Sequence, residues 1–215
     1  MTGNEAIRRD RMVRQLSARG IASQRVLRAM NEIPRERFVE EALSGKAYSD
    51  VSLPIGETQT ISQPWIVARM SELLEPDGHG KVLEIGSGSG YQAAVLSQLF
   101  ELVYSVERSP ELSRRARETV RKLEIENVHF KIFDGSYGWS EFGPYRAVLV
   151  TAAVPEIPAP LIEQLDVGGK LVLPLTEPDG GQILTRIVKG LHGVVREHHG
   201  PCRFVPLVGR YGVTG

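Results

Sequence analysis

The chain has 215 residues, of which 41 % are hydrophobic, and its 26 basic residues balance 26 acidic ones. This length suits one domain with a sizeable core, and a zero net charge removes the simplest argument for a nucleic-acid or anionic-membrane partner. A single cysteine excludes an internal disulfide, no apolar run approaches the ~18 residues of a membrane span, and the five histidines lack metal-binding spacing. We therefore expect a cytoplasmic protein with no metal, no nucleic-acid partner and no membrane partner. We also expect a monomer, although the sequence does not supply the oligomeric state.

The N-terminal part of the chain predicts helices followed by a long loop. Residues 4–31 read as two short amphipathic helices broken near Gly20. Residues 44–63 show no sustained period, and a loop of this length in a compact domain is usually functional or disordered. Pro64 suits the first turn of a helix, which we expect to continue over residues 65–74.

Strands and helices alternate through the rest of the chain. Apolar runs predict strands at 81–86, 102–107, 127–134, 145–153, 168–175, 182–189 and about 193–208, with helices at 91–99, 110–123 and 158–165. The alternation predicts a doubly wound, mostly parallel sheet with helices on both faces, closed by an antiparallel edge. Ligands bind such sheets beyond the carboxyl ends of the strands, so the residues just after each strand are the candidates for a site.

A glycine-rich turn follows the first of these strands. The segment EIGSGSG ends the strand with an acid, Glu84, and places glycines at Gly86, Gly88 and Gly90, where the backbone can approach a ligand closely. The dinucleotide fingerprint would need a glycine at Tyr91, and no GK[ST] follows for a phosphate loop. The spacing therefore favours a ligand with an adenosine part other than NAD, while a plain turn between strand and helix is the alternative.

Carboxylates follow the next two strands. Glu107 lies 21 residues beyond Gly86, a spacing at which an acid accepts hydrogen bonds from a ribose diol, although it also suits the start of a helix. Asp134 is placed to accept a hydrogen bond from an adenine amino group, although Asp134-Gly135 is also a common turn dipeptide. After the fourth strand, the small residues 151–153 either leave room for a reactive group or simply pack closely.

A glycine turn, a ribose acid and an adenine acid in this order resemble the S-adenosylmethionine-dependent methyltransferases of the Rossmann-like class. The resemblance narrows to the protein-L-isoaspartate (D-aspartate) O-methyltransferase family over about residues 13–209. It is carried by AYSDVSLPIGETQTISQP, VLEIGSGSGYQAA, VYSVER, FDGSYGW, VTAAVPEIPAPLIEQLDVGGKLVLP and CRFVPLVG. We expect one methyltransferase domain over residues 1–215, with N-terminal helices and an active-site loop at 1–63, a cofactor-binding core at 64–180 and C-terminal strands at 181–215.

The resemblance implies a repair enzyme. Its family methylates the free α-carboxylate of L-isoaspartyl residues in damaged proteins and peptides, using S-adenosylmethionine and leaving S-adenosylhomocysteine, and the ester then collapses to a succinimide. A carboxylate of reference pKa about 3.5 to 4 is already ionised at pH 7, so the reaction needs no general base. The rival interpretations are another S-adenosylmethionine-dependent methyltransferase acting on RNA or a small molecule, and a non-catalytic nucleotide-binding protein.

The resemblance also implies roles for particular residues. Ser62 is the family's active-site serine, and we expect its hydroxyl to hold the substrate carboxylate, while a helix cap before Pro64 is an alternative or additional role. Segment 203–209 forms either a wall for the substrate peptide or a core strand. Phe133 stands where bacterial relatives commonly have a glycine, which alters the packing expected beside Asp134. The cofactor-binding residues implied are Gln59, Thr60, Ile61, Gly86, Ser87, Gly88, Ser89, Gly90, Glu107, Asp134 and Gly135.

Overall fold

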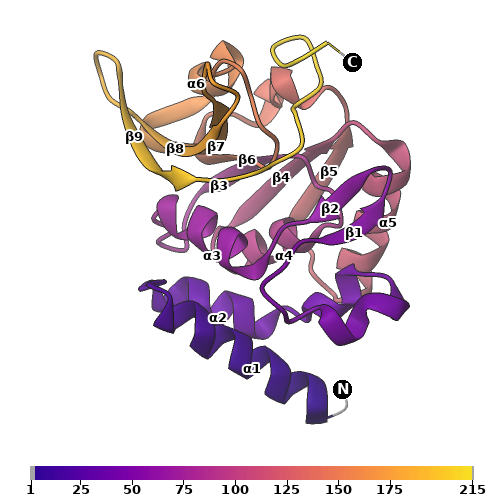
Figure 1. The fold of residues 1–215 in the computed structure, drawn as a ribbon. Helices are drawn as coiled ribbons and strands as arrows, with labels where there is room; N and C mark the ends of the chain where they lie inside the picture. Colours follow the sequence, from indigo (N-terminus) through magenta and orange to yellow (C-terminus); the bar gives the residue numbers. More distant parts are fainter. Residues whose placement is uncertain (1–2, 215) are drawn as a thin grey trace.

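A seven-stranded sheet forms the centre of the computed structural model, which describes residues 3–214 (Figure 1). Its strand order is β5-β4-β3-β6-β7-β8-β9. The bounds are β3 (Lys81–Ile85), β4 (Leu102–Glu107), β5 (Val128–Ile132), β6 (Tyr145–Val150), β7 (Leu165–Thr176), β8 (Gln182–Lys189) and β9 (Val194–Pro201). Strands β3 to β7 pair in parallel, whereas β8 pairs antiparallel with both β7 and β9. The predicted doubly wound sheet with an antiparallel edge is confirmed.

Helices cover both faces of this sheet (Figure 1). They are α1 (Gly3–Ala18), α2 (Gln24–Glu32), α3 (Pro64–Leu73), α4 (Tyr91–Ser97), α5 (Pro110–Lys122) and α6 (Ala159–Glu163), with short 3-10 helices η1 (Arg35–Phe38), η2 (Glu41–Lys46), η3 (Gly135–Tyr137) and η4 (Ser140–Phe142). Helices α3, α4 and α5 lie on one face, α1 and α2 pack outside them, and α6 lies on the other face. Across residues 3–214, no helix combines the length and apolar content that crossing a membrane requires.

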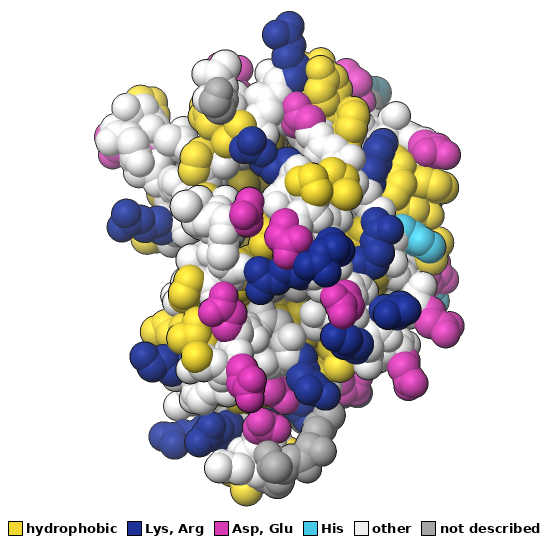
Figure 2. All heavy atoms as spheres, turned by 90° about the vertical axis from the view of Figure 1, so that its right-hand side faces the viewer, with side chains coloured by type: hydrophobic (Ala, Val, Ile, Leu, Met, Phe, Trp, Pro, Cys, Tyr) yellow, Lys and Arg dark blue, Asp and Glu magenta, His cyan; other side chains and the backbone are white. Residues whose placement is uncertain are grey.

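The two faces of the sheet have separate hydrophobic clusters, because side chains alternate along a strand. In β3, Val82 belongs to the cluster beneath α1 to α5, while Leu83 and Ile85 belong to the cluster beneath α6. The α5 side of the molecule carries acidic and basic side chains interspersed (Figure 2). There Arg114 pairs with Glu111 at 2.8 Å.

The expected loop at 44–63 contains a hairpin, so that part of the prediction was wrong. Strands β1 (Leu53–Gly56) and β2 (Gln59–Ile61) pair antiparallel. Glu57 and Thr58 at the tip both adopt positive φ, 52° and 56°. Tight hairpin turns with this conformation usually carry Asn-Gly or Asp-Gly, so Glu-Thr hides the signal in the sequence. The hairpin is tied to the body of the protein by Arg115, whose Nη1 donates to the Ile55 carbonyl at 2.9 Å.

The last predicted strand is shorter than expected, because β9 ends at Pro201 and the chain then leaves the sheet. Residues 202–208 run as an extended segment that bridges to Ala153, whose N–H donates to the Val205 carbonyl at 2.8 Å. The Gln182 side chain holds the same segment, because it donates to the Phe204 carbonyl at 3.0 Å and accepts from the Phe204 N–H at 2.7 Å. The core-strand alternative for 203–209 is therefore wrong.

Candidate active site

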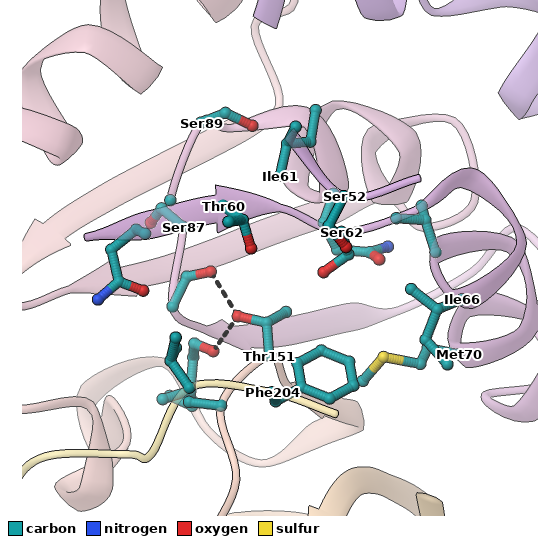
Figure 3. A pocket seen from close by; sticks show the side chains of 18 of the residues that line it. Ser52, Thr60, Ile61, Ser62, Ile66, Met70, Ser87, Ser89, Thr151 and Phe204 are labelled. Atoms are coloured by element: carbon teal, nitrogen blue, oxygen red, sulfur yellow. Dashed lines mark hydrogen bonds between the residues drawn. The ribbon is translucent and has the colours of Figure 1, made fainter. Parts of the chain in front are cut away.

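A cavity of about 620 Å³ opens where the sheet predicts one, beyond the carboxyl ends of β3, β4 and β6. The β1–β2 hairpin and helix α3 form one side of it, and residues 201–208 form the opposite side. Figure 3 shows Thr60 and Ser62 from the hairpin region, Ser87 from the glycine turn, and Phe204 from the C-terminal segment around the same space. Residues about 150 positions apart in the sequence thus line one cavity from opposite sides.

The glycine turn exposes its backbone to this cavity. Gly86 and Gly88 line the cavity with φ of 94° and 51°, a region that favours glycine. The Thr151 hydroxyl donates to the Gly86 carbonyl at 2.7 Å and lies 3.0 Å from that of Ile85 (Figure 3). Any Cβ at Gly86 would lie 2.4 Å from that hydroxyl oxygen. Thr151 therefore fixes the turn, and only glycine fits beside it.

Gly90 has a different position from the other glycines of the turn. It starts α4 with a φ of 87° and lies outside the cavity lining. A Cβ there would lie 3.0 Å from the Ala116 Cβ on α5. Its absence of a side chain allows α4 and α5 to approach each other, so the geometry shows a packing role for Gly90.

Glu107 lies beside the glycine turn at the end of β4. Its carboxylate is buried, lines the cavity and accepts from the Gly88 N–H at 3.0 Å and from the Ser109 N–H at 2.9 Å. Ser109 is the N-cap of α5, where its side chain accepts from Leu112, so the helix-start feature is also present. Each Glu107 oxygen accepts one backbone hydrogen bond and keeps capacity for a second donor from a ligand.

A second carboxyl group lies behind the turn. Glu84 on β3 is completely buried, and the Ser105 hydroxyl donates to it. Ser105 in turn is 2.5 Å from the Ser87 hydroxyl, which lines the cavity. Burial raises the pKa of Glu84 to about 8, and the nearby charge of Glu107 acts in the same direction. A chain of polar groups therefore leads from a neutral carboxyl group in the core to the cavity wall.

Asp134 and Gly135 occupy different positions, because only Gly135 lines the cavity. The Asp134 carboxylate accepts from the Ser136 N–H at 2.9 Å, the Ser136 hydroxyl at 2.7 Å and the Arg210 N–H at 2.8 Å. Partial burial disfavours the charged form, but these hydrogen bonds outweigh it and lower the pKa of Asp134. The turn role is confirmed, and the adenine contact stays a prediction. The Phe133 side chain beside it is 43 % exposed.

Ser62 lies in the cavity wall next to Ser52 (Figure 3). The expectation that Ser62 also caps α3 is wrong, because the N-cap residue is Gln63 and it makes no capping hydrogen bond with its side chain. Instead, the Asp50 carboxylate accepts from the Trp65 N–H at 2.8 Å and satisfies the first turn of α3. The Ser62 hydroxyl is therefore not engaged in capping the helix that follows it.

The remaining lining residues supply both polar and apolar surface. Gln59, Thr60 and Ile61 all line the cavity from β2, and Ser89 lines it from the glycine turn. Sequence reasoning missed several others, namely Ser52, Ile66, Met70, Gln92 and Arg108. Ile66 and Met70 are four residues apart on α3 and so share a helix face, and Arg108 directly follows Glu107. These two features of the sequence could have identified the three residues as site candidates.

The chain matches known proteins over nearly its whole length. A family model described as protein-L-isoaspartate(D-aspartate) O-methyltransferase matches residues 7–212. Protein-L-isoaspartate O-methyltransferase 2 of Geotalea uraniireducens is 54 % identical over 214 residues, 99 % of this chain and 98 % of that protein. Protein-L-isoaspartate O-methyltransferase of Geobacter metallireducens is 52 % identical over 211 residues, 97 % of each chain.

Solved structures agree with this similarity. A protein-L-isoaspartate O-methyltransferase structure superposes with a TM-score of 0.88 at 34 % identity, covering 95 % of this chain and 67 % of that chain. A putative protein-L-isoaspartate O-methyltransferase from Plasmodium falciparum, in complex with S-adenosyl-L-homocysteine, superposes with a TM-score of 0.79 at 25 % identity. That match covers 93 % of this chain and 98 % of that chain.

Proposed function

Because the chain belongs to the protein-L-isoaspartate(D-aspartate) O-methyltransferase family, we infer that it is a protein repair methyltransferase. It transfers a methyl group from S-adenosylmethionine to the free α-carboxylate of L-isoaspartyl residues in damaged proteins and peptides. The observation that carries this function is the meeting of two segments at one cavity. The hydroxyl-bearing loop that ends at Ser62 faces the glycine turn and Glu107, so a carboxylate and an adenosine-containing ligand can lie side by side.

The cavity fits S-adenosylmethionine, which supplies an electrophilic methyl group on a sulfonium when bound. A volume of about 620 Å³ lies in the range of small-ligand sites. Gly86 lines the cavity and carries no side chain, so its backbone is open to a ligand, and Glu107 retains lone pairs for a ribose diol. The residues that we propose line or contact the cofactor are Gln59, Thr60, Ile61, Gly86, Ser87, Gly88, Ser89, Glu107 and Gly135, with Gly90 supporting the turn.

At the adenine end, we propose that Gly135 forms the wall and that Asp134 accepts from the adenine amino group. Among residues 3–214, the donor to Asp134 Oδ2 is the Arg210 N–H, and a second lone pair of that oxygen can accept from a ligand. The other oxygen, Oδ1, is occupied by the two donors of Ser136.

For the substrate, we propose that Ser62 holds the α-carboxylate through its hydroxyl, with Ser52 beside it as a second donor. A neutral hydroxyl fixes the carboxylate without neutralising its charge, so the free lone pairs stay nucleophilic. Ile66, Met70 and Phe204 add apolar surface that excludes water from this side of the cavity. Neutralisation of charge during methyl transfer is favoured in such surroundings, and in-line alignment can contribute on the order of 7–11 kcal/mol.

Segment 203–208 is proposed to be the wall on which the damaged peptide lies. It is extended, it lines the cavity opposite Ser62, and Gln182 fixes its backbone at Phe204. A peptide that pairs with main chain rather than with particular side chains can vary in sequence. This fits a repair enzyme, whose substrates share only the damaged linkage.

We also propose one methyltransferase domain over residues 1–215 that acts as a cytoplasmic monomer without a metal. The support for one domain is a single hydrophobic cluster that joins Leu16 of α1 and Met30 of α2 to Val82 and Leu149 in the sheet. The N-terminal helices are thus part of the same core as the sheet that carries the cofactor site. Sedimentation at the mass of one chain is the expected result, and a dimer contradicts the monomer.

Labelled S-adenosylmethionine tests this function when offered with an L-isoaspartyl peptide and with its normal aspartyl twin. We expect base-labile label only in the isoaspartyl peptide. Equal labelling of both peptides, or labelling of RNA or a small molecule instead, contradicts the assignment.

The Ser62→Ala variant tests the carboxylate-holding role. The turnover number should fall about 10- to 100-fold, the effect of losing one hydrogen bond to a charged group, worth about 1.5–3 kcal/mol. The dissociation constant for S-adenosylhomocysteine should change by less than about threefold. Ser17→Ala, at an exposed position on α1, is the matched control and should behave as wild type. A collapse of cofactor binding in Ser62→Ala would instead place Ser62 in the cofactor site.

A further inference from the structure

Arg35, the first residue of η1, is a completely buried arginine behind the cavity wall. Charged side chains are almost never fully buried unless they are paired, because an ion loses its hydration there. The carboxylate whose charge acts on Arg35 is Asp50, but Asp50 forms its ion pair with Arg19 and accepts from the Trp65 N–H. The Arg35 cation is thus held in the core by groups other than a bound acid.

Three contacts hold the guanidinium. Its Nε donates to the Ala47 carbonyl at 2.8 Å, and its Nη2 donates to the Ser62 carbonyl at 2.6 Å. Its central carbon lies 4.7 Å from the centre of the Tyr91 ring, the geometry of a cation–π contact. Its Nη1 is buried without a partner among the residues that the structure describes.

These contacts connect the hairpin segment of the cavity wall to the residue that follows the glycine turn. Ala47 and Ser62 lie at the two ends of the segment that contains the β1–β2 hairpin. The guanidinium, a rigid planar group, is hydrogen-bonded to both ends. Tyr91 is the residue that follows the glycine turn, and it lines the cavity. An isolated two-stranded hairpin is only marginally stable, so this segment needs such an anchor to keep a defined position.

We propose that Arg35 is a positioning residue for methyl transfer, which sets the place of Ser62 relative to the glycine turn without touching substrate or cofactor. This inference rests on the proposed function. An apolar side chain could fill the same space between these segments without a charge or a hydrogen bond. What the planar fork adds is two hydrogen bonds of fixed direction to the backbone at Ala47 and Ser62.

Two substitutions of Arg35 distinguish the directed hydrogen bonds of the guanidinium from simple packing. Arg35→Lys keeps the charge but provides one flexible donor group in place of the fork, and Arg35→Met removes every donor. Val26→Ala, a cavity-forming change at a buried position of α2, is the stability control, because Val26 belongs to the same N-terminal layer but lies outside the cavity lining.

Turnover of the isoaspartyl peptide is measured at a temperature where circular dichroism shows every variant to be folded. We expect the turnover number to fall about 10-fold in Arg35→Lys and about 100-fold in Arg35→Met, with S-adenosylhomocysteine affinity within about threefold of wild type. Val26→Ala should keep turnover within about threefold of wild type, even if its melting temperature falls as much as that of the Arg35 variants. An equal loss of turnover in Val26→Ala, or unchanged turnover in both Arg35 variants, overturns the proposal.

Amide hydrogen exchange supplies a readout that does not need turnover. In Arg35→Lys, and in Arg35→Met if it folds, exchange in residues 57–63 should accelerate at least about tenfold, while exchange in residues 203–208 stays unchanged. Unchanged exchange in 57–63 overturns the proposal even if wild type methylates isoaspartyl peptides. If wild type leaves those peptides unmethylated, the proposed function fails while the exchange result still decides the role of Arg35.

Discussion

Gly86→Ala should destabilise the protein by an amount that the structure divides into two parts. The φ of 94° at Gly86 is a conformation that costs an L-residue about 1–2 kcal/mol. The new Cβ would also lie 2.4 Å from the Thr151 hydroxyl oxygen, and overpacking of a well-packed site costs about 1–3 kcal/mol. The expected loss in the free energy of unfolding is therefore about 2–5 kcal/mol.

Gly20→Ala is the matched control for the backbone part. Gly20 has a φ of 96°, and a Cβ there would meet nothing within 4 Å. Its loss should be only about 1–2 kcal/mol. Urea unfolding of both variants isolates the steric part by difference, and titration with S-adenosylhomocysteine should show weakened binding in Gly86→Ala alone.

The steric part depends on one oxygen atom, so a double-mutant cycle tests it. Thr151→Ala removes that oxygen together with its hydrogen bond to the Gly86 carbonyl. In the Thr151→Ala background, Gly86→Ala should cost about as little as Gly20→Ala costs in wild type. The reasoning is refuted if Gly86→Ala loses no more stability than Gly20→Ala, or if Thr151→Ala leaves the cost of Gly86→Ala unchanged.

Three further predictions concern the cavity and the core behind it. Because burial raises the pKa of Glu84 from 4.5 to about 8, the unfolded chain binds fewer protons than the folded chain between these values, and wild-type stability falls as pH rises through this window. Urea unfolding should therefore show that Glu84→Gln gains stability relative to wild type between pH 5 and pH 8, by at most about 1.4 kcal/mol per pH unit. If the unfolding free energies of the two proteins change in parallel with pH, the buried carboxyl group is not neutral. Glu107→Gln should weaken S-adenosylhomocysteine binding about 10- to 100-fold by calorimetry, whereas Glu111→Gln, at an exposed position on α5, should not; equal affinities exclude the ribose role. Phe204→Ala should raise the KM for the isoaspartyl peptide about tenfold through loss of about 1.5 kcal/mol of apolar contact, with cofactor affinity unchanged; an unchanged KM removes Phe204 from the peptide wall.

The core strands were predictable because their signal is local. In β3, a short apolar run ends in glycines, and its observed bounds, Lys81–Ile85, differ from the prediction by one residue. Gly86 and Glu107 were identified as site candidates for the same reason, since each directly follows a recognisable parallel strand and such strands end at one edge. Both residues line the cavity.

The hairpin and the helix cap could not be predicted, because their determinants are not in the local pattern. Glu57 and Thr58 form a tight turn without the residues that normally mark one, and Arg115 holds the hairpin from 60 residues away. The first turn of α3 is satisfied by Asp50, 15 residues before the N–H that it accepts from. A search for a cap next to Pro64 therefore selects the wrong residue.

The sequence by itself determined the alternation of strands and helices, the glycine turn, the acid after β4 and the family to which the chain belongs, because each is encoded in short runs or fixed spacings. The tertiary structure alone decided that residues 202–208 leave the sheet to line the cavity. It also decided that the Asp134 carboxylate accepts from the backbone N–H of Arg210, and that Arg35 donates to the carbonyl of Ser62. These contacts join segments 27 to 76 residues apart, and in each of them at least one partner is a backbone group, which any residue type carries. No pattern of side chains announces such a partner, so only the folded chain reveals it.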